Sequence, residues 1–271
     1  MNNQPIGVFD SGLGGLTVMR ELKRLLPNEE LIYFGDTARV PYGSRSPETI
    51  IKYVASDIRF LRNFNVKLIV AACGTASSVA LPLLREESTI PLISVVEPAA
   101  AAAVRRTEKG PIGVLGTQGT IDSGAFRKTI SGLNPQMKIV EKACPMFVPL
   151  VENGYINPQN PVTRLVVKEY LEELCAAQVE TVIMGCTHYP LLEDFLKEAL
   201  PEKVSLINMG QATAEYVKQY LAETDSARED KTPPRLRYFW SEQSKNLDMF
   251  RFDSELFDCL SQMQEIEIDG V

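Results

Sequence analysis

Two cysteines occupy matching positions in two similar stretches of the chain. Cys73 follows the apolar run 68–72, and Cys186 comes shortly after the apolar run 181–184. Each run predicts a buried strand, and the small and polar residues that follow predict a turn opening into a helix. A helix N-terminus favours the thiolate form of a cysteine, so both residues are candidate acid–base groups. Two thiols placed alike predict one site between two similar halves.

Polar side chains near these cysteines could assist a proton transfer. Asp10 follows the strand predicted at 6–9 and begins a glycine-rich turn, which resembles a phosphate cradle. A carboxylate argues against phosphate there, and Gly12 stands where an aspartyl-phosphate hydrolase has its second aspartate. Asp10 is therefore either a helix N-cap, a partner of a base or a ligand for an ammonium group. His188, the only histidine, is either a packed or capping residue or a proton relay for Cys186.

The remaining candidates are less specific. Glu152 is either a solvated surface acid or part of the site, and the other three cysteines are expected to be small core residues. Threonines at strand ends either cap helices or, with the N–H groups of helix starts, hold carboxylates. These threonines are Thr75, Thr117, Thr120 and Thr187, and the three other cysteines are Cys144, Cys175 and Cys259.

Composition limits the function further. Among 271 residues, 28 are basic and 35 acidic, giving a net charge of −7, which argues against nucleic acid or an anionic membrane as the main partner. No apolar run approaches the roughly 20 residues of a membrane span. The N-terminus has neither the basic nor the apolar part of a signal peptide, so we expect a cytoplasmic protein. Five widely spaced cysteines and one histidine make a zinc site or a disulfide framework unexpected.

The order of the predicted elements indicates an α/β fold with mostly parallel sheets, because strands and helices alternate throughout. The pattern also repeats: Ile6-Gly7-Val8 matches Ile112-Gly113-Val114 at an offset of 106, and Cys73 matches Cys186 at an offset of 113. We predict two pseudo-symmetric, doubly wound α/β domains with the active site in the cleft between them. Ligands of such sheets bind beyond the carboxyl ends of the strands, where all the candidate turns lie.

The expected elements can be stated by residue range. Strands are predicted at 6–9, 31–34, 68–72, 92–96, 112–115, 138–140, 181–184, 204–207 and 237–240, and a short helix and strand are predicted to finish the chain. Helices are predicted at 17–26, 47–61, 74–85, from 98 onward, around 126–130, from 161 to about 174, after 188 and at 211–221. The polar stretch 223–234 is predicted to be a solvated loop.

Four motifs give the chain a specific resemblance. Val8-Phe9-Asp10-Ser11-Gly12-Leu13-Gly14-Gly15, Pro41-Tyr42-Gly43, Cys73-x-Thr75-Ala76-Ser77 and Gly185-Cys186-Thr187-His188-Tyr189-Pro190 resemble the glutamate racemases. The resemblance extends from residue 6 to about residue 260. It implies a cofactor-independent enzyme that interconverts L- and D-glutamate for peptidoglycan, with one thiol on each face of the substrate α-carbon.

The same resemblance implies roles for individual residues. Asp10 would assist Cys73, His188 would assist Cys186, and Glu152 matches an acid near the second thiol. The substrate contacts implied are Asp10, Ser11, Pro41, Tyr42, Gly43, Gly74, Thr75, Thr117, Thr120, Thr187 and His188. It also implies discontinuous domains, 1–97 plus 208–271 and 98–207, and a homodimer, which the residues themselves do not indicate.

The chain departs from the family pattern at one position. The family usually has asparagine after the first cysteine, whereas this chain has Gly74, so we expect an amide contact to the substrate head group to be missing. An aspartate or hydantoin racemase of the same superfamily is the rival enzyme. A weakly active binding or inhibitor protein is the rival outside enzymes.

Overall fold

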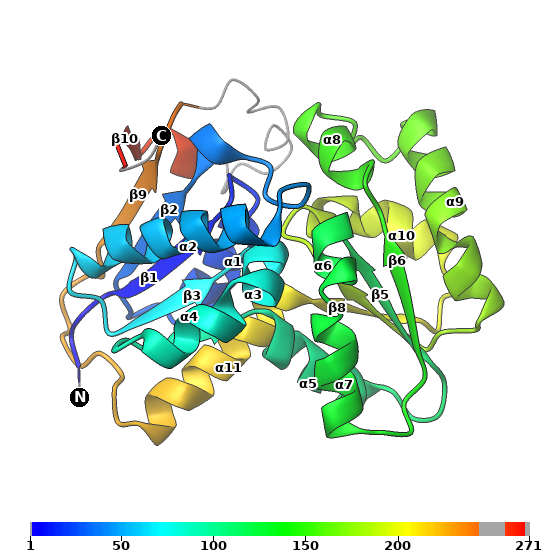
Figure 1. Ribbon diagram of the computed structural model, residues 1–271, viewed down its shortest axis with the longest axis horizontal. Coiled ribbons are helices and arrows are strands. Elements are labelled where there is room, and N and C mark those ends of the chain that lie inside the picture. Colours follow the sequence, from blue (N-terminus) through cyan, green and yellow to red (C-terminus); the bar gives the residue numbers. More distant parts are fainter. Residues whose placement is uncertain (1, 244–257, 269–271) are drawn as a thin grey trace.

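Two parallel β-sheets, each covered by helices, lie side by side in the computed structural model (Figure 1). The structure describes residues 2–243 and 258–268. Within these residues, none of the helices combines the length and the apolar character that a membrane crossing requires. The sheets differ in size, with six strands in the first and four in the second.

The first sheet has the strand order β10-β9-β2-β1-β3-β4, and every neighbouring pair is parallel. It holds the N-terminal part of the chain together with the C-terminal strands, of which β9 pairs with β2 and β10 pairs with β9. Its strands are β1 (Ile6–Asp10), β2 (Leu31–Gly35), β3 (Leu68–Ala71), β4 (Leu92–Ser94), β9 (Leu236–Trp240) and β10 (Met263–Glu265).

The second sheet repeats the inner part of the first. Its order is β6-β5-β7-β8, again parallel throughout, and it matches the order β2-β1-β3-β4 strand for strand. Its strands are β5 (Ile112–Gly116), β6 (Ile139–Ala143), β7 (Thr181–Met184) and β8 (Ser205–Asn208). The predicted α/β class and the pseudo-symmetry are therefore confirmed. Strands β9 and β10 of the first sheet have no counterpart in the second.

Side-chain caps explain where several helices begin. Ser46, Asn160 and Asn208 each accept a hydrogen bond from a backbone N–H of the following turn, and proline follows the first two. The helices are α1 (Leu16–Leu25), α2 (Pro47–Arg62), α3 (Gly74–Val79), α4 (Leu81–Glu87), α5 (Val96–Arg106), α6 (Gln118–Asp122), α7 (Ala125–Leu133), α8 (Phe147–Glu152), α9 (Pro161–Ala176), α10 (Glu193–Ala199) and α11 (Met209–Glu223), with short 3₁₀ helices at η1 (Thr37–Arg39) and η2 (Tyr189–Leu192).

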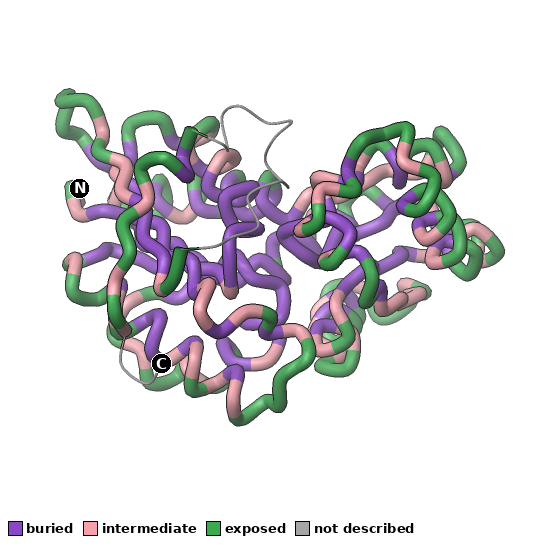
Figure 2. Tube along the Cα trace, turned by 90° about the horizontal axis from the view of Figure 1, so that it is seen from above, coloured by how far each residue is buried: buried purple, intermediate pink, exposed green. Residues whose placement is uncertain are grey.

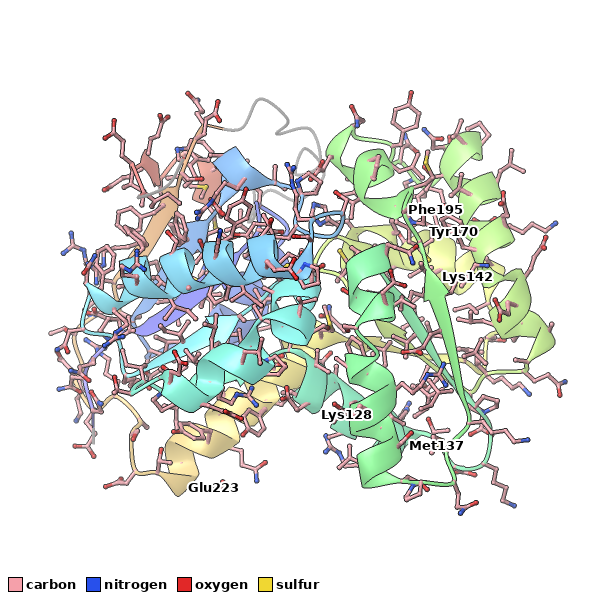
Figure 3. All side chains as sticks on the ribbon, viewed as in Figure 1. Lys128, Met137, Lys142, Tyr170, Phe195 and Glu223 are labelled. Carbon is pink, nitrogen blue, oxygen red and sulfur yellow. The ribbon has the colours of Figure 1, made fainter. Side chains whose placement is uncertain are left out.

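Both faces of each sheet are covered by apolar packing. In β1, Val8 belongs to the core on one face and Phe9 to the core on the other, because successive side chains of a strand point to opposite faces. The buried residues follow the strands and the inner helix faces (Figure 2). One core continues into the second sheet, where Phe195 and the partly buried Tyr170 pack with it (Figure 3). The central strands, which carry the candidate residues at their carboxyl ends, are therefore held between apolar layers.

The structure differs from the sequence-based expectations in local detail. The helix expected at 74–85 is divided into α3 and α4, and α6 was not predicted. Helix α5 begins at Val96 rather than at Pro98, because Ser94 accepts the Val96 N–H at 2.9 Å and ends the preceding strand early. In the stretch after residue 240, where a short helix is expected without stated bounds, residues 244–257 lie outside the described residues and residues 258–260 are helical.

Candidate active site

A cavity of about 310 Å³ lies where the ends of the two sheets meet, and it contains both matched cysteines. Most of the predicted site residues line it, whereas Asp10 and Thr120 lie behind its wall. The lining residues are Ser11, Val40, Pro41, Tyr42, Gly43, Ser44, Cys73, Gly74, Thr75, Thr117, Gln118, Cys144, Pro145, Val148, Pro149, Glu152, Gly185, Cys186, Thr187 and His188. The cavity has room for a small molecule of amino-acid size.

Cys73 enters the cavity from the first sheet, at the start of α3. Its sulfur accepts the Ala76 N–H at 3.5 Å and lies 3.6 Å from the Ser11 hydroxyl. Burial, reinforced by the nearby charge of Asp10, raises the pKa of the Cys73 thiol to about 12. The expectation that the helix start favours a thiolate here is not met, because burial outweighs the two hydrogen bonds. Cys73 therefore holds its proton at neutral pH in the free protein.

Cys186 enters from the second sheet and has a different partner. Its sulfur lies 3.8 Å from Nδ1 of His188, and Nε2 of that ring lies 3.3 Å from Oε1 of Glu152. Burial lowers the pKa of His188, but its interactions with Cys186 and Glu152 outweigh that effect and raise it to about 10. At neutral pH the ring is an imidazolium between a sulfur and a carboxylate. The two thiols are thus unequal: one is buried beside a carboxylate, and the other is next to a cation.

The unusual state of His188 can be observed directly, since it is the only histidine of the chain. We expect its ring signals in an NMR titration to move near pH 10, and Glu152→Gln to lower that value because it removes a negative neighbour. A histidine whose folded pKa is raised contributes stability that is complete below its unfolded pKa of about 6.5 and is lost as pH rises toward 10. A ring that titrates near pH 6.5 in the wild-type protein would contradict the placement of His188 between Cys186 and Glu152.

Asp10 ends β1 and is fully buried. One of its oxygens accepts the Gly12 N–H at 3.1 Å, and the other lies 3.5 Å from the Thr187 hydroxyl. Burial raises the pKa of Asp10, while the charge of His188 and the backbone N–H groups of the turn oppose that rise. Asp10 therefore connects the first sheet to the Thr187–His188 end of the second.

The glycine-rich turn after Asp10 packs closely against the second half at Gly14 and against the first half at Gly15. A Cβ atom at Gly14 would lie 2.5 Å from the Thr187 hydroxyl and 2.7 Å from the His188 ring. A Cβ atom at Gly15 would lie 2.4 Å from the Cβ atom of Asp10 itself. Glycine is required at both positions because a backbone must approach closely there.

Three threonines form a triangle of hydroxyl groups across the cleft. Thr75, from the first half, lies 2.9 Å from Thr117 and 3.3 Å from Thr120, oxygen to oxygen, and the latter two are 3.0 Å apart. Thr117 also caps α6 by accepting the Thr120 N–H at 3.3 Å. The structure thus brings these predicted residues together, with hydroxyl groups that can donate to a carboxylate.

The loop from Pro41 to Ser44 closes one side of the cavity. Its Gly43 carbonyl accepts the N–H of Gly119 at 3.1 Å, which links the loop to α6 of the second half. Tyr42 lines the cavity, yet its hydroxyl group is hydrogen-bonded to Asp36 and Asp57 behind the wall. The polar end of Tyr42 is therefore occupied within the protein.

Gly74 lies against the backbone of the other half. A Cβ atom at this position would lie 2.4 Å from the carbonyl oxygen of Gly185, the residue before Cys186. Real Cβ atoms do not come so close to a backbone atom, so a side chain here requires a shift of the strand end that carries Cys186. Glycine at position 74 is thus required by the spacing of the two cysteine-bearing segments, in addition to leaving out an amide.

The family pattern alone predicts that asparagine at position 74 improves substrate binding, whereas the close contact with Gly185 predicts that it impairs the enzyme. We expect Gly74→Ala, and equally Gly74→Asn, to lower kcat/KM about 10-fold or more, because the spacing between the thiols changes. Gly132→Ala in the last turn of α7 is the matched control, because a Cβ atom there meets nothing within 4 Å. Steady-state kinetics of the three variants provide the comparison. A lower KM for Gly74→Asn would instead support a missing amide contact.

Several lining residues were not predicted. Cys144, Pro145, Val148 and Pro149 come from the segment between β6 and α8, and Gln118 from the start of α6. In the structure β6 extends to Ala143, so Cys144 directly follows it at the sheet edge that carries the other site residues, whereas the strand predicted at 138–140 ends too early to show this. Burial raises the pKa of the Cys144 thiol. Among residues 2–243 and 258–268, no group of three or more His, Cys, Asp and Glu side chains is placed to hold a metal ion.

Comparison with known proteins agrees with this architecture. Residues 6–217 match the family model described as Asp/Glu/Hydantoin racemase. A glutamate racemase of Geobacter metallireducens is 45% identical over 88% of this chain and 87% of its own. The crystal structure of a glutamate racemase from Bacillus anthracis matches with a TM-score of 0.90 at 36% identity, covering 98% of both chains. That of Francisella tularensis, in complex with D-glutamate, matches with a TM-score of 0.88 at 31% identity over the full length of both.

The chain belongs to the Asp/Glu/Hydantoin racemase family. Within that family it is one of the glutamate racemases, and it is therefore an isomerase.

Proposed function

We propose that this protein interconverts L- and D-glutamate without a cofactor, by proton transfer between two thiols and the substrate α-carbon. The observation that carries the proposal is that Cys73 and Cys186, from equivalent strand ends of two pseudo-symmetric sheets, line the same cavity. Inversion at a carbon needs one base on each face, with one group protonated and the other deprotonated at the start. Two thiols entering from opposite halves meet this requirement.

The surroundings of the thiols support a division of labour. The imidazolium of His188, held by Glu152, stabilises negative charge on the sulfur of Cys186. Cys73 keeps its proton in the free protein and is the proton donor when Cys186 is the base. Asp10 assists Cys73 in the opposite direction, in which Cys73 removes the proton. Enclosure of the bound substrate would exclude water and strengthen these electrostatic interactions.

Substrate binding is assigned to the polar rim of the cavity. The hydroxyl groups of Thr75, Thr117 and Thr187, with the backbone at the starts of α3 and α6, hold the carboxylates. Ser11, Gly74 and the loop of Pro41, Tyr42 and Gly43 complete the contacts, while Asp10 and Thr120 act from behind the wall. The complex of the Francisella tularensis relative with D-glutamate supports glutamate as the ligand.

The wider role follows from the same assignment. We propose that the product D-glutamate supplies peptidoglycan synthesis in the cytoplasm, and that the protein is a homodimer. We also propose two domains, a discontinuous one of residues 1–97 plus 208–271 and a second one of residues 98–207, and the division of the strands between the two sheets supports this.

The test is a racemisation assay by circular dichroism. Purified protein is expected to racemise both L- and D-glutamate to an equal mixture and to act at most weakly on aspartate or a hydantoin. Preferred turnover of aspartate or the hydantoin would assign the rival enzyme activity. Binding of glutamate without turnover would assign a sensor or inhibitor role.

A further inference from the structure

A buried cluster of charged groups lies directly behind the loop of residues 41–44. Asp36 and Asp57 are fully buried, Arg39 is 7% exposed, and the Tyr42 side chain reaches into the cluster from the loop. Arg39 donates from Nε to Oδ2 of Asp36 at 2.6 Å and from a terminal nitrogen to Oδ1 of Asp57 at 2.9 Å. Two buried carboxyl groups thus share one guanidinium.

The hydrogen bonds of Tyr42 show how this charge imbalance is resolved. Its hydroxyl oxygen makes a short contact with Oδ2 of Asp36 and lies 2.9 Å from Oδ2 of Asp57. A phenol has one hydrogen and can donate to only one of them. If the hydroxyl donates to Asp36, the contact with Asp57 is a hydrogen bond only when the Asp57 carboxyl carries a proton.

The hydrogen bonds that the two carboxyl groups accept also indicate that Asp57, rather than Asp36, carries the proton. Asp36 accepts on both oxygens, since Oδ2 receives Arg39 and Tyr42 and Oδ1 receives the Ser241 hydroxyl at 3.0 Å. Asp57 accepts from Arg39 on one oxygen only and has its other oxygen free to donate. Asp36 therefore needs to be a carboxylate, whereas a neutral Asp57 satisfies every contact it makes.

We propose that Asp57 is protonated in the folded protein and donates to Tyr42, which in turn donates to Asp36. We propose further that this chain of hydrogen bonds makes Asp36 and Asp57 positioning residues for the substrate-binding loop 41–44; this second part rests on the proposed function. With a proton on Asp57 the cluster is electrically neutral, because the Arg39 cation is balanced by the Asp36 carboxylate. Burial of an unbalanced carboxylate would be far more costly.

The loop is coupled to the cluster because Tyr42 belongs to both. Pro41, Gly43 and Ser44 line the cavity on either side of it, and Gly43 holds α6 through its carbonyl oxygen. The titratable and charged groups that face Asp57 are Asp36, Arg39 and Tyr42, with Asp10 further away. All of these groups are buried, and a change in the cluster reaches the loop through Tyr42.

The test compares two substitutions that look alike but make opposite demands. In Asp57→Asn, the amide oxygen can accept from Arg39 while the amide nitrogen donates to Tyr42, so KM for glutamate is expected to stay within about twofold of wild type. In Asp36→Asn, an amide nitrogen at the Oδ2 position faces the donors Arg39 and Tyr42, and an amide nitrogen at the Oδ1 position still leaves Arg39 without the Asp36 carboxylate, so KM is expected to rise about 10-fold or more with a smaller change in kcat. Asp57→Ala removes the donor and should raise KM, and its rescue by Asp57→Asn separates donation from charge.

A melting experiment tests the protonation without any activity. The wild-type melting temperature should fall by about 3 °C per pH unit relative to Asp57→Asn between pH 5 and pH 8, because the unfolded chain ionises Asp57 and the folded one does not. Tyr42→Phe, which keeps the ring, replaces Asp36→Asn if the latter does not fold, and it should raise KM similarly.

If Asp57→Asn raises KM as much as Asp36→Asn does, the proposed protonation of Asp57 is overturned. If Asp36→Asn, Asp57→Ala and Tyr42→Phe lower the melting temperature but leave KM unchanged, the positioning role is overturned. An inactive wild-type protein would reject the proposed function while the melting comparison still decides the first part.

Discussion

Replacing either Cys73 or Cys186 by serine is expected to reduce racemisation at least about 10³-fold in both directions. A serine hydroxyl is a far weaker acid than a thiol. It is therefore not ionised and cannot act as the base, and it gives up its proton to the carbanion much less readily. Each variant keeps one thiol and should still exchange the α-proton of the enantiomer that faces it. Racemisation by circular dichroism and solvent-proton exchange by NMR together make the measurement.

Cys175→Ser is the matched control for these two variants. Cys175 lies in α9, and its sulfur is within 3.8 Å of the Ala199 carbonyl, away from the residues that line the cavity. This variant should retain near-normal kinetics. A Cys186→Ser protein with a rate close to that of Cys175→Ser would contradict the assignment of the second base.

Replacing His188 by asparagine is expected to lower kcat about 10²-fold, with unequal losses in the two directions. His188 contacts only one of the thiols, Cys186, and general acid–base partners typically contribute effects of this size. The equilibrium constant of a racemisation is unity, so kcat/KM must fall equally both ways while the kcat values need not. Glu152→Gln, which keeps the imidazole but removes its ion-pair partner, should give a weaker effect in the same direction. Equal kcat losses for L- and D-glutamate would argue against a side-specific role.

The fold could be predicted from the sequence because its signals are local and repeated. The apolar runs of β1 and β3 recur in β5 and β7, and the structure repeats the strand order of the first sheet in the second. Element ends were less accurate where a single side chain decides them, as at Ser94, whose hydroxyl accepts the Val96 N–H. The five-residue α6 has too few residues for a helical period to show.

The residues of the site could be named from their motifs, but their protonation and their hydrogen-bond partners could not be predicted. The sequence placed Cys73 at a helix start, whereas its raised pKa depends on burial and on Asp10, which only the fold brings near. Tyr42 was expected to contact substrate, yet the partners of its hydroxyl are Asp36 and Asp57. The requirement for glycine at position 74 comes from Gly185, more than a hundred residues away. Such contacts between distant segments leave no pattern in one sequence.

Racemisation in D₂O tests whether one thiol acts on each face of the α-carbon. Starting from L-glutamate, one thiolate removes the α-proton and the opposite thiol delivers a deuteron from solvent. We expect D-glutamate formed at early times to be fully deuterated at the α-carbon while the remaining L-glutamate is largely unlabelled, as measured by mass spectrometry of both enantiomers. A single base that serves both faces would return some of the original protons, so substantial unlabelled D-glutamate would rule out a two-base mechanism.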